Sequence, residues 1–367
     1  MKIALDGACL SSRLTGVGRY FQSLLSELLP LDTANEYTLF LKEDFETHLD
    51  FPNLHTHVLA RQGSYLYWQN TLLGKAVRRG HFDLFWSPNY TLPFFMPTPS
   101  LLTVHDISWK ALPDNYSPLN RLYRNFAGAH SFKRARVIFT DSDFSRDEII
   151  KRTAVPAAKV KRIHLGIDER FRCAAAGEIE AWKAHHGLTG KRLIGFLGNF
   201  FKRRHVPEII AAQKILRKRH PDTVLLLIGE NHAVPENTLK KNKMDILWLQ
   251  RLPENELNAF YSSLSLFLNI SEYEGFGLPP MEALNCDTVS LLLRRSSLAE
   301  LYGDLALFVD RPDPELIAAA ISGFLQQEEE AKRQLLNRWQ VRKPYFSWKR
   351  AAKEYLREIE SLPCKSS

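Results

Sequence analysis

Residues 264–282 read LSLFLNISEYEGFGLPPME, an apolar run that leads through a glycine loop into two prolines. The run Leu264–Ile270 predicts a buried strand, because its length and apolar content fit a strand of a parallel sheet. Two prolines fit the first turn of a helix, where a missing N–H breaks no hydrogen bond. The stretch therefore predicts one strand–loop–helix unit of an α/β sheet.

The same alternation of apolar runs and helical patterns fills the chain, which is typical of parallel α/β architecture. The first set of predicted strands is Lys2–Leu5, Tyr37–Lys42, His55–Leu59, Leu84–Ser87, Ser100–His105, Val137–Asp141 and Val160–Leu165. The second set is Arg192–Leu197, Thr223–Ile228, Asp245–Leu249, Leu264–Ile270, Thr288–Leu293 and Ala306–Val309. We therefore expect two Rossmann-like domains, residues 1–172 and 190–343, with a ligand cleft at the carboxyl ends of their strands.

Three segments lie outside these strands. A helical pattern runs from Val17 to Leu29 and is predicted to stop at Pro30. Polar, alanine-rich residues 172–191 predict a linker. Within the tail, residues 344–367, the stretch Ser347–Leu362 predicts a helix, because its apolar side chains can share one face.

The chain of 367 residues carries 49 − 41 = +8 charges, an excess that favours phosphate-bearing substrates, nucleic acid or an anionic membrane. Its four cysteines are Cys9, Cys173, Cys286 and Cys364; they form no Cys-x-x-Cys pair, which argues against a disulfide framework and a zinc site. No apolar run approaches the roughly 18 residues of a membrane span. We expect a cytoplasmic protein, with any membrane contact peripheral and on the inner face of the cytoplasmic membrane.

Two glycine-containing loops follow predicted strands. Gly16 and Gly18, at the start of the first helix, could let backbone N–H groups approach a phosphate, although an ordinary turn explains them equally well. The pattern Gly-x-Gly-x-x-Gly of dinucleotide sites is absent, which disfavours NAD. After Leu197, the cations Arg203 and Arg204 stand beside a glycine turn and could clamp a diphosphate; a solvated charge run is the alternative.

Two carboxylates flank the glycine loop of the opening stretch. Glu274 precedes the predicted helix and could accept hydrogen bonds from sugar hydroxyls. Glu282 is predicted in the first turn, where it could bind a ribose or merely complement the helix dipole. One histidine, His105, ends another predicted strand. A lone histidine is commonly structural, but this strand end would face the cleft, which favours a functional role.

The segment Asp141-Ser142-Asp143 matches the Asp-x-Asp pattern of metal-dependent transferases. We disfavour a metal there, because Arg203, Arg204 and a helix N-terminus already supply positive charge. Ser145-x-x-Glu148 is read as a capping box, so this segment is predicted to start a helix.

Together these residues resemble the family 4 retaining glycosyltransferases with the GT-B fold. The most specific element is Glu-x7-Glu, present as Glu274 and Glu282. Supporting motifs in the matching order are Thr15–Tyr20, Ser87–Tyr90, Val104–Asp106, Thr140–Ser142, Leu165–Asp168, Leu298–Glu300 and Phe346–Trp348. The resemblance implies two parallel sheets facing across a cleft, an acceptor domain followed by a donor domain, and a terminal helix that returns to the first domain.

The resemblance also implies roles for single residues. The backbones of Gly16 and Gly18 would lie near the donor phosphates, and His105 near the reacting carbon of the sugar. Arg203 and Arg204 would bind the diphosphate, although the family has a lysine at the position of Arg204. Within the Glu-x7-Glu motif, Glu274 would orient the sugar, Glu282 would hold the ribose, and the N–H groups between them would contact sugar and phosphate. These N–H groups belong to Phe276, Gly277 and Leu278.

Overall similarity to bacterial mannosyltransferases of surface-polysaccharide assembly favours GDP-mannose as donor, with UDP-sugars open, and a glycan or lipid-linked acceptor. No cofactor and no catalytic metal are implied. A GT-B nucleotide-sugar epimerase or a sugar phosphorylase is the alternative; a nucleic-acid-binding protein is remote, because zinc-finger and RNP-like signatures are absent. Tyr65, Tyr67 and Trp68, with cations such as Arg121, could rest on an anionic membrane, or could be core aromatics beside a solvated face.

Overall fold

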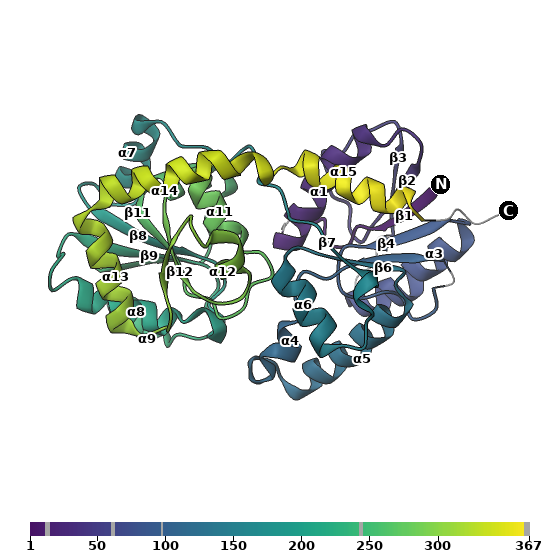
Figure 1. Cartoon of the computed structure of the whole chain (residues 1–367), viewed down its shortest axis with the longest axis horizontal. Coiled ribbons are helices and arrows are strands. Elements are labelled where there is room, and N and C mark those ends of the chain that lie inside the picture. The colour runs from purple at the N-terminus through teal and green to yellow at the C-terminus, as the bar shows by residue number, and fades with distance from the viewer. Residues whose placement is uncertain (12–14, 60–62, 97, 242–244, 363–367) are drawn as a thin grey trace. The chain divides into compact units, whose positions relative to one another are not determined.

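The computed structural model describes residues 1–11, 15–59, 63–96, 98–241 and 245–362 (Figure 1). The chain forms two compact units, one made of Met1–Gly166 with Tyr345–Ser367 and the other of Ile167–Pro344. Each unit contains one parallel sheet with helices on both faces. Cys364 lies outside the described residues.

The first unit is built on a seven-stranded sheet in the order β3-β2-β1-β4-β5-β6-β7, with every pairing parallel. Its strands are β1 Lys2–Asp6, β2 Glu36–Leu41, β3 Leu54–Val58, β4 Leu84–Ser87, β5 Ser100–Thr103, β6 Val137–Thr140 and β7 Val160–Arg162. Its helices are α1 Gly16–Leu31, α2 Tyr65–Tyr67, α3 Gly74–Arg79, α4 Ser108–Ala111, α5 Pro118–Arg134, α6 Asp143–Arg152 and α15 Trp348–Glu360. A π-helical segment, Trp68–Leu73, joins α2 to α3.

Helix α1 corrects one prediction, because it continues through Pro30 to Leu31. Proline has the φ angle of a helix, and so close to the end it removes only one hydrogen bond. The next N–H, that of Asp32, still bonds the carbonyl of Leu28 at 3.0 Å. The apolar face of the helix, from Tyr20 to Leu29, is buried as its spacing predicts.

Helix α15 packs against α1 in the first unit, as the resemblance implied. Ser347 caps its N-terminus, and Tyr355 stacks on Trp86 of β4 at 5.2 Å between ring centroids. Gly166 permits the approach of this helix, because a Cβ atom there would lie 2.1 Å from the backbone nitrogen of Trp348. The tail is therefore an integral part of the first core.

The second unit has a six-stranded parallel sheet in the order β10-β9-β8-β11-β12-β13. Its strands are β8 Arg192–Leu197, β9 Thr223–Ile228, β10 Ile246–Leu249, β11 Leu264–Asn269, β12 Ser290–Leu293 and β13 Leu307–Val309. Its helices are α7 Ala176–His185, α8 Val206–Leu216, α9 Glu236–Lys241, α10 Leu257–Ser263, α11 Leu278–Asn285, α12 Ser296–Tyr302, α13 Pro314–Gln326 and α14 Glu328–Arg342. Every predicted strand of both sets is present, with small differences at the ends.

Two cores cover the two faces of this sheet. Along β9, Leu225 and Leu227 pack with α8 and α13, whereas Val224, Leu226 and Ile228 pack with α7, α10 and α11. Side chains on a strand alternate between faces, and both faces here are buried, so the whole strand is apolar.

The stretch 172–191 is not a simple linker, which corrects the prediction. Helix α7 lies within it, and Trp182 is buried against Phe260 of α10 at 6.1 Å between ring centroids. The indole N–H of Trp182 donates to Glu256 at 2.9 Å. One large apolar side chain thus fixes an otherwise polar helix to the second unit. Across the described ranges, helices long and apolar enough to span a bilayer are absent.

Candidate active site

The main cluster of predicted site residues lies where β8 and β11 meet. These strands are neighbours in the second sheet although β9 and β10 come between them in the chain. At such a point the crossover connections run in opposite directions and leave space outside the carboxyl ends of the strands, where α/β proteins bind ligands. The loop after β8 carries Arg203 and Arg204, and the loop after β11 carries Glu274.

Arg204 and Glu274 are in direct contact. The Nε of Arg204 donates to Oε1 of Glu274 at 3.2 Å, and the two side chains are 18% and 13% exposed. The Nη1 of Arg204 also donates to the carbonyl of Asn199 at 3.4 Å. The backbone N–H of Glu272 donates a hydrogen bond of 2.9 Å to the carbonyl of Arg203, and this bond connects the two loops. The structure therefore joins two residues that the sequence predicted separately.

The turn after β8 is shaped by two residues with positive φ. Gly198 has φ 140°, and a Cβ atom there would lie 2.1 Å from Nη1 of Arg204, so the glycine leaves room for the guanidinium. His205 has φ 50° and caps α8, and its ring nitrogens lie 3.4 Å from Glu208 and 3.0 Å from Glu272. These contacts fix the segment that carries the arginines.

Arg203 and Arg204 are half-buried, unlike the exposed Lys202 beside them. The guanidinium carbon of Arg203 lies 5.2 Å from the ring centroid of Phe201, and its buried Nε has no hydrogen-bond partner among the described residues. A solvated charge run would point its cations into water. The alternative interpretation therefore fits Lys202 but not the two arginines.

The backbone of the Glu274 loop is held by α12. The N–H of Glu274 donates to Oγ of Ser296 at 3.1 Å, and Oγ of Ser297 donates to the carbonyl of Glu274 at 2.8 Å. Gly277 caps α11 with φ 85°, and the hydroxyl of Tyr302 donates to its carbonyl. Phe276 is buried beside this cap, and Leu278 begins the helix. The predicted Phe276–Leu278 contacts thus lie at a helix N-terminus, where N–H groups favour anions.

Glu282 is not in the first turn of α11, which corrects the prediction. The helix begins at Leu278 and its first turn contains no acidic residue, so the helix-dipole explanation is wrong. Glu282 is only 4% exposed and accepts a hydrogen bond of 2.7 Å from the hydroxyl of Tyr261. Burial, and then the charges of Glu282 and Glu274, raise the pKa of Tyr302 well above its ordinary value. The charges of both carboxylates of the motif therefore raise the pKa of one buried tyrosine.

Gly16 and Gly18 lie in the first unit, at the start of α1. Thr15 is the N-cap, and its Oγ1 accepts from the N–H of Gly18 at 3.5 Å, so that N–H contributes to the cap. Gly16 is exposed, and a Cβ atom on it would meet none of the described residues within 4 Å. The fold itself thus gives no steric reason for glycine at this position.

His105 also lies in the first unit, just after β5. Its Nδ1 lies 2.6 Å from Oδ2 of Asp141, and its Nε2 lies 3.2 Å from the carbonyl of Pro88. Burial is the largest influence and disfavours the charged ring, but the carboxylate of Asp141, together with Asp106 and the carbonyl of Pro88, outweighs it, and the pKa of His105 is raised. Two oxygen acceptors match a ring that carries protons on both nitrogens.

Asp141 is therefore a partner of His105, a role that the Asp-x-Asp interpretation missed. The helix that follows is capped by Ser142, whose Oγ accepts from the N–H of Ser145 at 3.1 Å, and not by Ser145 as predicted. The hydroxyl of Ser145 instead donates to the carbonyl of His105 at 3.0 Å. The signal available in the sequence was position, because His105 and Asp141 follow adjacent strands.

Comparison with known proteins supports this architecture. The family model described as Glycosyltransferase Family 4 matches residues 14–171, and the model described as Glycosyl transferases group 1 matches residues 178–337. The O-antigen chain mannosyltransferase B of Escherichia coli is 27% identical over 350 residues, which cover 89% of this chain and 91% of the relative. A GDP-mannose-dependent alpha-(1-6)-phosphatidylinositol dimannoside mannosyltransferase of Mycobacterium tuberculosis is 24% identical over 65% of this chain and 61% of its own length.

Solved structures share the fold. The Anabaena protein HepE, crystallised with UDP and glucose, superposes with a TM-score of 0.77 at 16% identity, covering 99% of this chain and 100% of that one. The two parallel sheets, the order of their strands and the returning terminal helix are those of the GT-B architecture. This chain belongs to the GT-B glycosyltransferases, with a family 4 region at residues 14–171 and a group 1 region at residues 178–337.

Proposed function

We propose that this enzyme transfers mannose from GDP-mannose to a glycan or lipid-linked acceptor, with retention of configuration and without a catalytic metal. The observation that carries the proposal is the contact between Arg204 and Glu274, 3.2 Å long, at the point where β8 meets β11. We further propose that the reaction serves cell-surface polysaccharide assembly in the cytoplasm.

The two arginines suit a diphosphate leaving group. Breaking the bond between sugar and diphosphate develops negative charge on the phosphate oxygens, and preorganised cations stabilise that charge better than water does. Arg204 is already held by Asn199 and Glu274, so little reorganisation is needed when the charge appears. This supply of positive charge supports a mechanism that needs no metal.

The carboxylates divide the remaining tasks. Glu274 lies against Arg204 and is proposed to orient the sugar that the diphosphate carries. Glu282, deeper in the unit and bonded to Tyr261, is proposed to hold the ribose. The roles predicted for Gly16, Gly18 and His105 of the first unit stay predictions.

The choice of GDP-mannose follows from the relatives. An O-antigen chain mannosyltransferase and a GDP-mannose-dependent enzyme are both similar to this chain. UDP-glucose is the competing donor, because a protein of the same fold was crystallised with UDP and glucose.

Thermal shift with GDP, UDP, GDP-mannose and UDP-glucose tests the donor, because a ligand that binds only the folded state raises the Tm. We expect GDP and GDP-mannose to give the largest shifts. A transfer assay with GDP-mannose in the presence of EDTA then tests metal independence, and NMR of the product tests retention. An epimerase would convert the donor without any acceptor, and a phosphorylase would need inorganic phosphate; either result would replace the proposal.

A further inference from the structure

The first unit exposes large apolar side chains on one helix and one neighbouring loop. The five most exposed large apolar residues among those described are Phe95 82%, Val341 82%, Leu119 81%, Leu122 68% and Phe126 64%. All except Val341 belong to the first unit, three of them on α5 and one in the loop before β5. Isolated exposed apolar side chains are ordinary, but a group of them marks an interaction surface.

These side chains form one patch. Leu119, Leu122 and Phe126 are spaced by three and four residues, so they share one face of α5. The ring of Phe94 lies 5.6 Å from the ring of Phe126, which brings the loop of Phe95 against the same helix. We define Phe95, Leu119, Leu122 and Phe126 as the α5 patch. The other side of α5, which includes Ser131 and Phe132, is buried in the core.

The charged side chains on α5, and those bonded to the loop of Phe95, are positive, and the exposed Asp114 lies before the helix. Arg78 donates to the carbonyl of Phe95 at 2.9 Å and Arg134 to the carbonyl of Met96 at 2.6 Å, so two guanidinium groups sit at the base of this loop. Arg121 is exposed on α5 itself. Residues 115–140 contain no aspartate or glutamate. Arg124 is not part of this charge, because its guanidinium lies over the rings of an aromatic cluster formed by Tyr90, Trp109 and Tyr116.

We propose that the α5 patch docks the enzyme on an anionic phospholipid bilayer, with the apolar side chains at the headgroup boundary and the arginines on the lipid phosphates. Apolar area and basic flanks together are what interfacial membrane binding requires. Two copies of the chain meeting on this face would oppose like charges, whereas an anionic lipid surface neutralises them. The aromatic residues predicted for this role are mostly not available: Trp68 is buried, and the hydroxyl of Tyr65 donates to Asp6 at 2.8 Å.

The test is sedimentation of the full chain with vesicles of phosphatidylcholine alone or mixed with phosphatidylglycerol. We expect binding to the mixed vesicles that weakens as salt is added, because salt screens the attraction. The double substitution Leu122→Gln and Phe126→Gln is expected to lower vesicle binding by about tenfold or more. The matched control is Val341→Gln, which removes an equally exposed apolar side chain from the second unit and is expected to bind as the wild type does.

Three results would overturn the proposal: no binding of the wild type to mixed vesicles, equal binding of the double variant, or a wild-type oligomer that the double variant dissociates. The last would identify the α5 patch as a contact between copies of the chain. Circular dichroism and the thermal shift with GDP verify that the double variant folds and binds nucleotide. Because vesicle binding is measured without any donor, its failure and the failure of the proposed transfer reaction are separate results.

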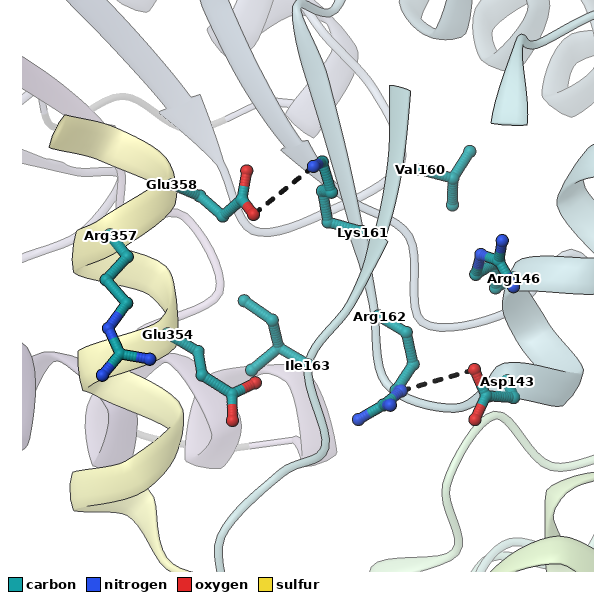
Figure 2. Close-up of a pocket in the computed structure, with 9 residues that line it drawn as sticks. All are labelled: Asp143, Arg146, Val160, Lys161, Arg162, Ile163, Glu354, Arg357 and Glu358. Atoms are coloured by element: carbon teal, nitrogen blue, oxygen red, sulfur yellow. Dashed lines mark hydrogen bonds and ion pairs between the residues drawn. The ribbon is translucent and has the colours of Figure 1, made fainter. Parts of the chain in front are cut away.

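A pocket of 430 Å³ lies beside β7 in the first unit (Figure 2). Its lining has four cations and three carboxylates, and two ion pairs form among them: Lys161 lies 3.5 Å from Glu358 and Arg162 lies 3.4 Å from Asp143. A lining in which cations and carboxylates nearly balance offers little net attraction to an ionic ligand. The α5 patch is the surface on which charge and apolar area act together.

Discussion

Arg204 and Glu274 form an ion pair of 3.2 Å although 70 positions separate them in the chain. Both side chains are largely shielded from solvent, so salt screens this pair less than it screens a surface pair. The same guanidinium is the proposed ligand of the donor diphosphate. Glu274 thus holds the cation in place and also competes with the phosphate for it, and these two effects can be measured separately.

Replacing Arg204 with alanine is expected to lower kcat for mannose transfer by about a hundredfold, the effect of removing one preorganised donor from an oxyanion site. Arg204→Lys should retain part of the activity, because it keeps the charge but loses the planar fork. The control is Arg251→Ala, which removes an exposed arginine paired with Glu230 at 3.0 Å in the same unit. Steady-state kinetics with GDP-mannose make the comparison, and near-normal turnover of Arg204→Ala would contradict the assignment.

The substitution Glu274→Gln is expected to separate nucleotide binding from catalysis. Without the carboxylate, Arg204 has no competing anion, so the affinity for GDP alone should rise several-fold. Turnover of GDP-mannose should fall about tenfold or more, because the sugar loses its acceptor group. Isothermal titration with GDP and kinetics with GDP-mannose measure the two effects. A weaker affinity for GDP would show that Glu274 does not compete with the diphosphate.

The strands could be predicted from the sequence because strands buried on both faces are continuous apolar runs. Elements that depend on one tertiary contact could not. Helix α7 lies in a polar, alanine-rich stretch and is fixed by the burial of Trp182. The continuation of α1 through Pro30 depends on where the helix ends, which a pattern locates poorly.

The candidate site, too, could be predicted from the sequence only in part. Arg204 and Glu274 were predicted separately as ligand contacts, and the order of β8 and β11 explains why they meet. The local Asp-x-Asp pattern suggests a metal ligand at Asp141, whereas the partner of Asp141 in the structure is His105, which follows the neighbouring strand. The α5 patch had no sequence signal, because apolar residues at helical spacing ordinarily predict burial.

The pair of His105 and Asp141 predicts a pH-dependent stability. Burial opposes the charge on His105, yet Asp141 raises its pKa, so the folded state binds the proton more tightly than the unfolded state does. The resulting stability is fully present below the unfolded pKa of about 6.5 and is lost as pH rises through the higher folded value. Asp141→Asn should therefore lower the free energy of unfolding by about 2 kcal/mol at low pH and by less at high pH.

Denaturant unfolding of wild type and Asp141→Asn between about pH 5.5 and 8.5 tests this sign, over a range that brackets the ordinary histidine pKa. The control is Asp143→Asn, two residues away, which removes a partly exposed ion pair with Arg162, 3.4 Å long. We expect its small effect to change little over the same range, since surface pairs contribute little. If the difference in free energy of unfolding between wild type and Asp141→Asn did not change with pH, His105 would not take up the extra proton on folding.

Two glycine substitutions separate a structural role from a proposed ligand contact. Gly277→Ala places a side chain at φ 85° and a Cβ atom 2.7 Å from Leu298, so it should reduce stability by about 1–3 kcal/mol. In Gly16→Ala the added methyl group meets no atom of the described part of the chain within 4 Å, so the Tm should be unchanged or slightly higher. If Gly16→Ala loses activity while its Tm is unchanged, the loss arises from a contact with a ligand and not from unfolding.

For Gly16→Ala we expect kcat/KM for GDP-mannose to fall about tenfold, because the methyl group would keep the backbone from approaching the donor phosphates. Thermal unfolding and kinetics on the same preparation make the two readings comparable. Thr15 is unchanged, so the hydrogen bond that its side chain accepts from the N–H of Gly18 is expected to persist in the variant. Full activity in Gly16→Ala at an unchanged Tm would contradict the placement of this glycine at the donor phosphates.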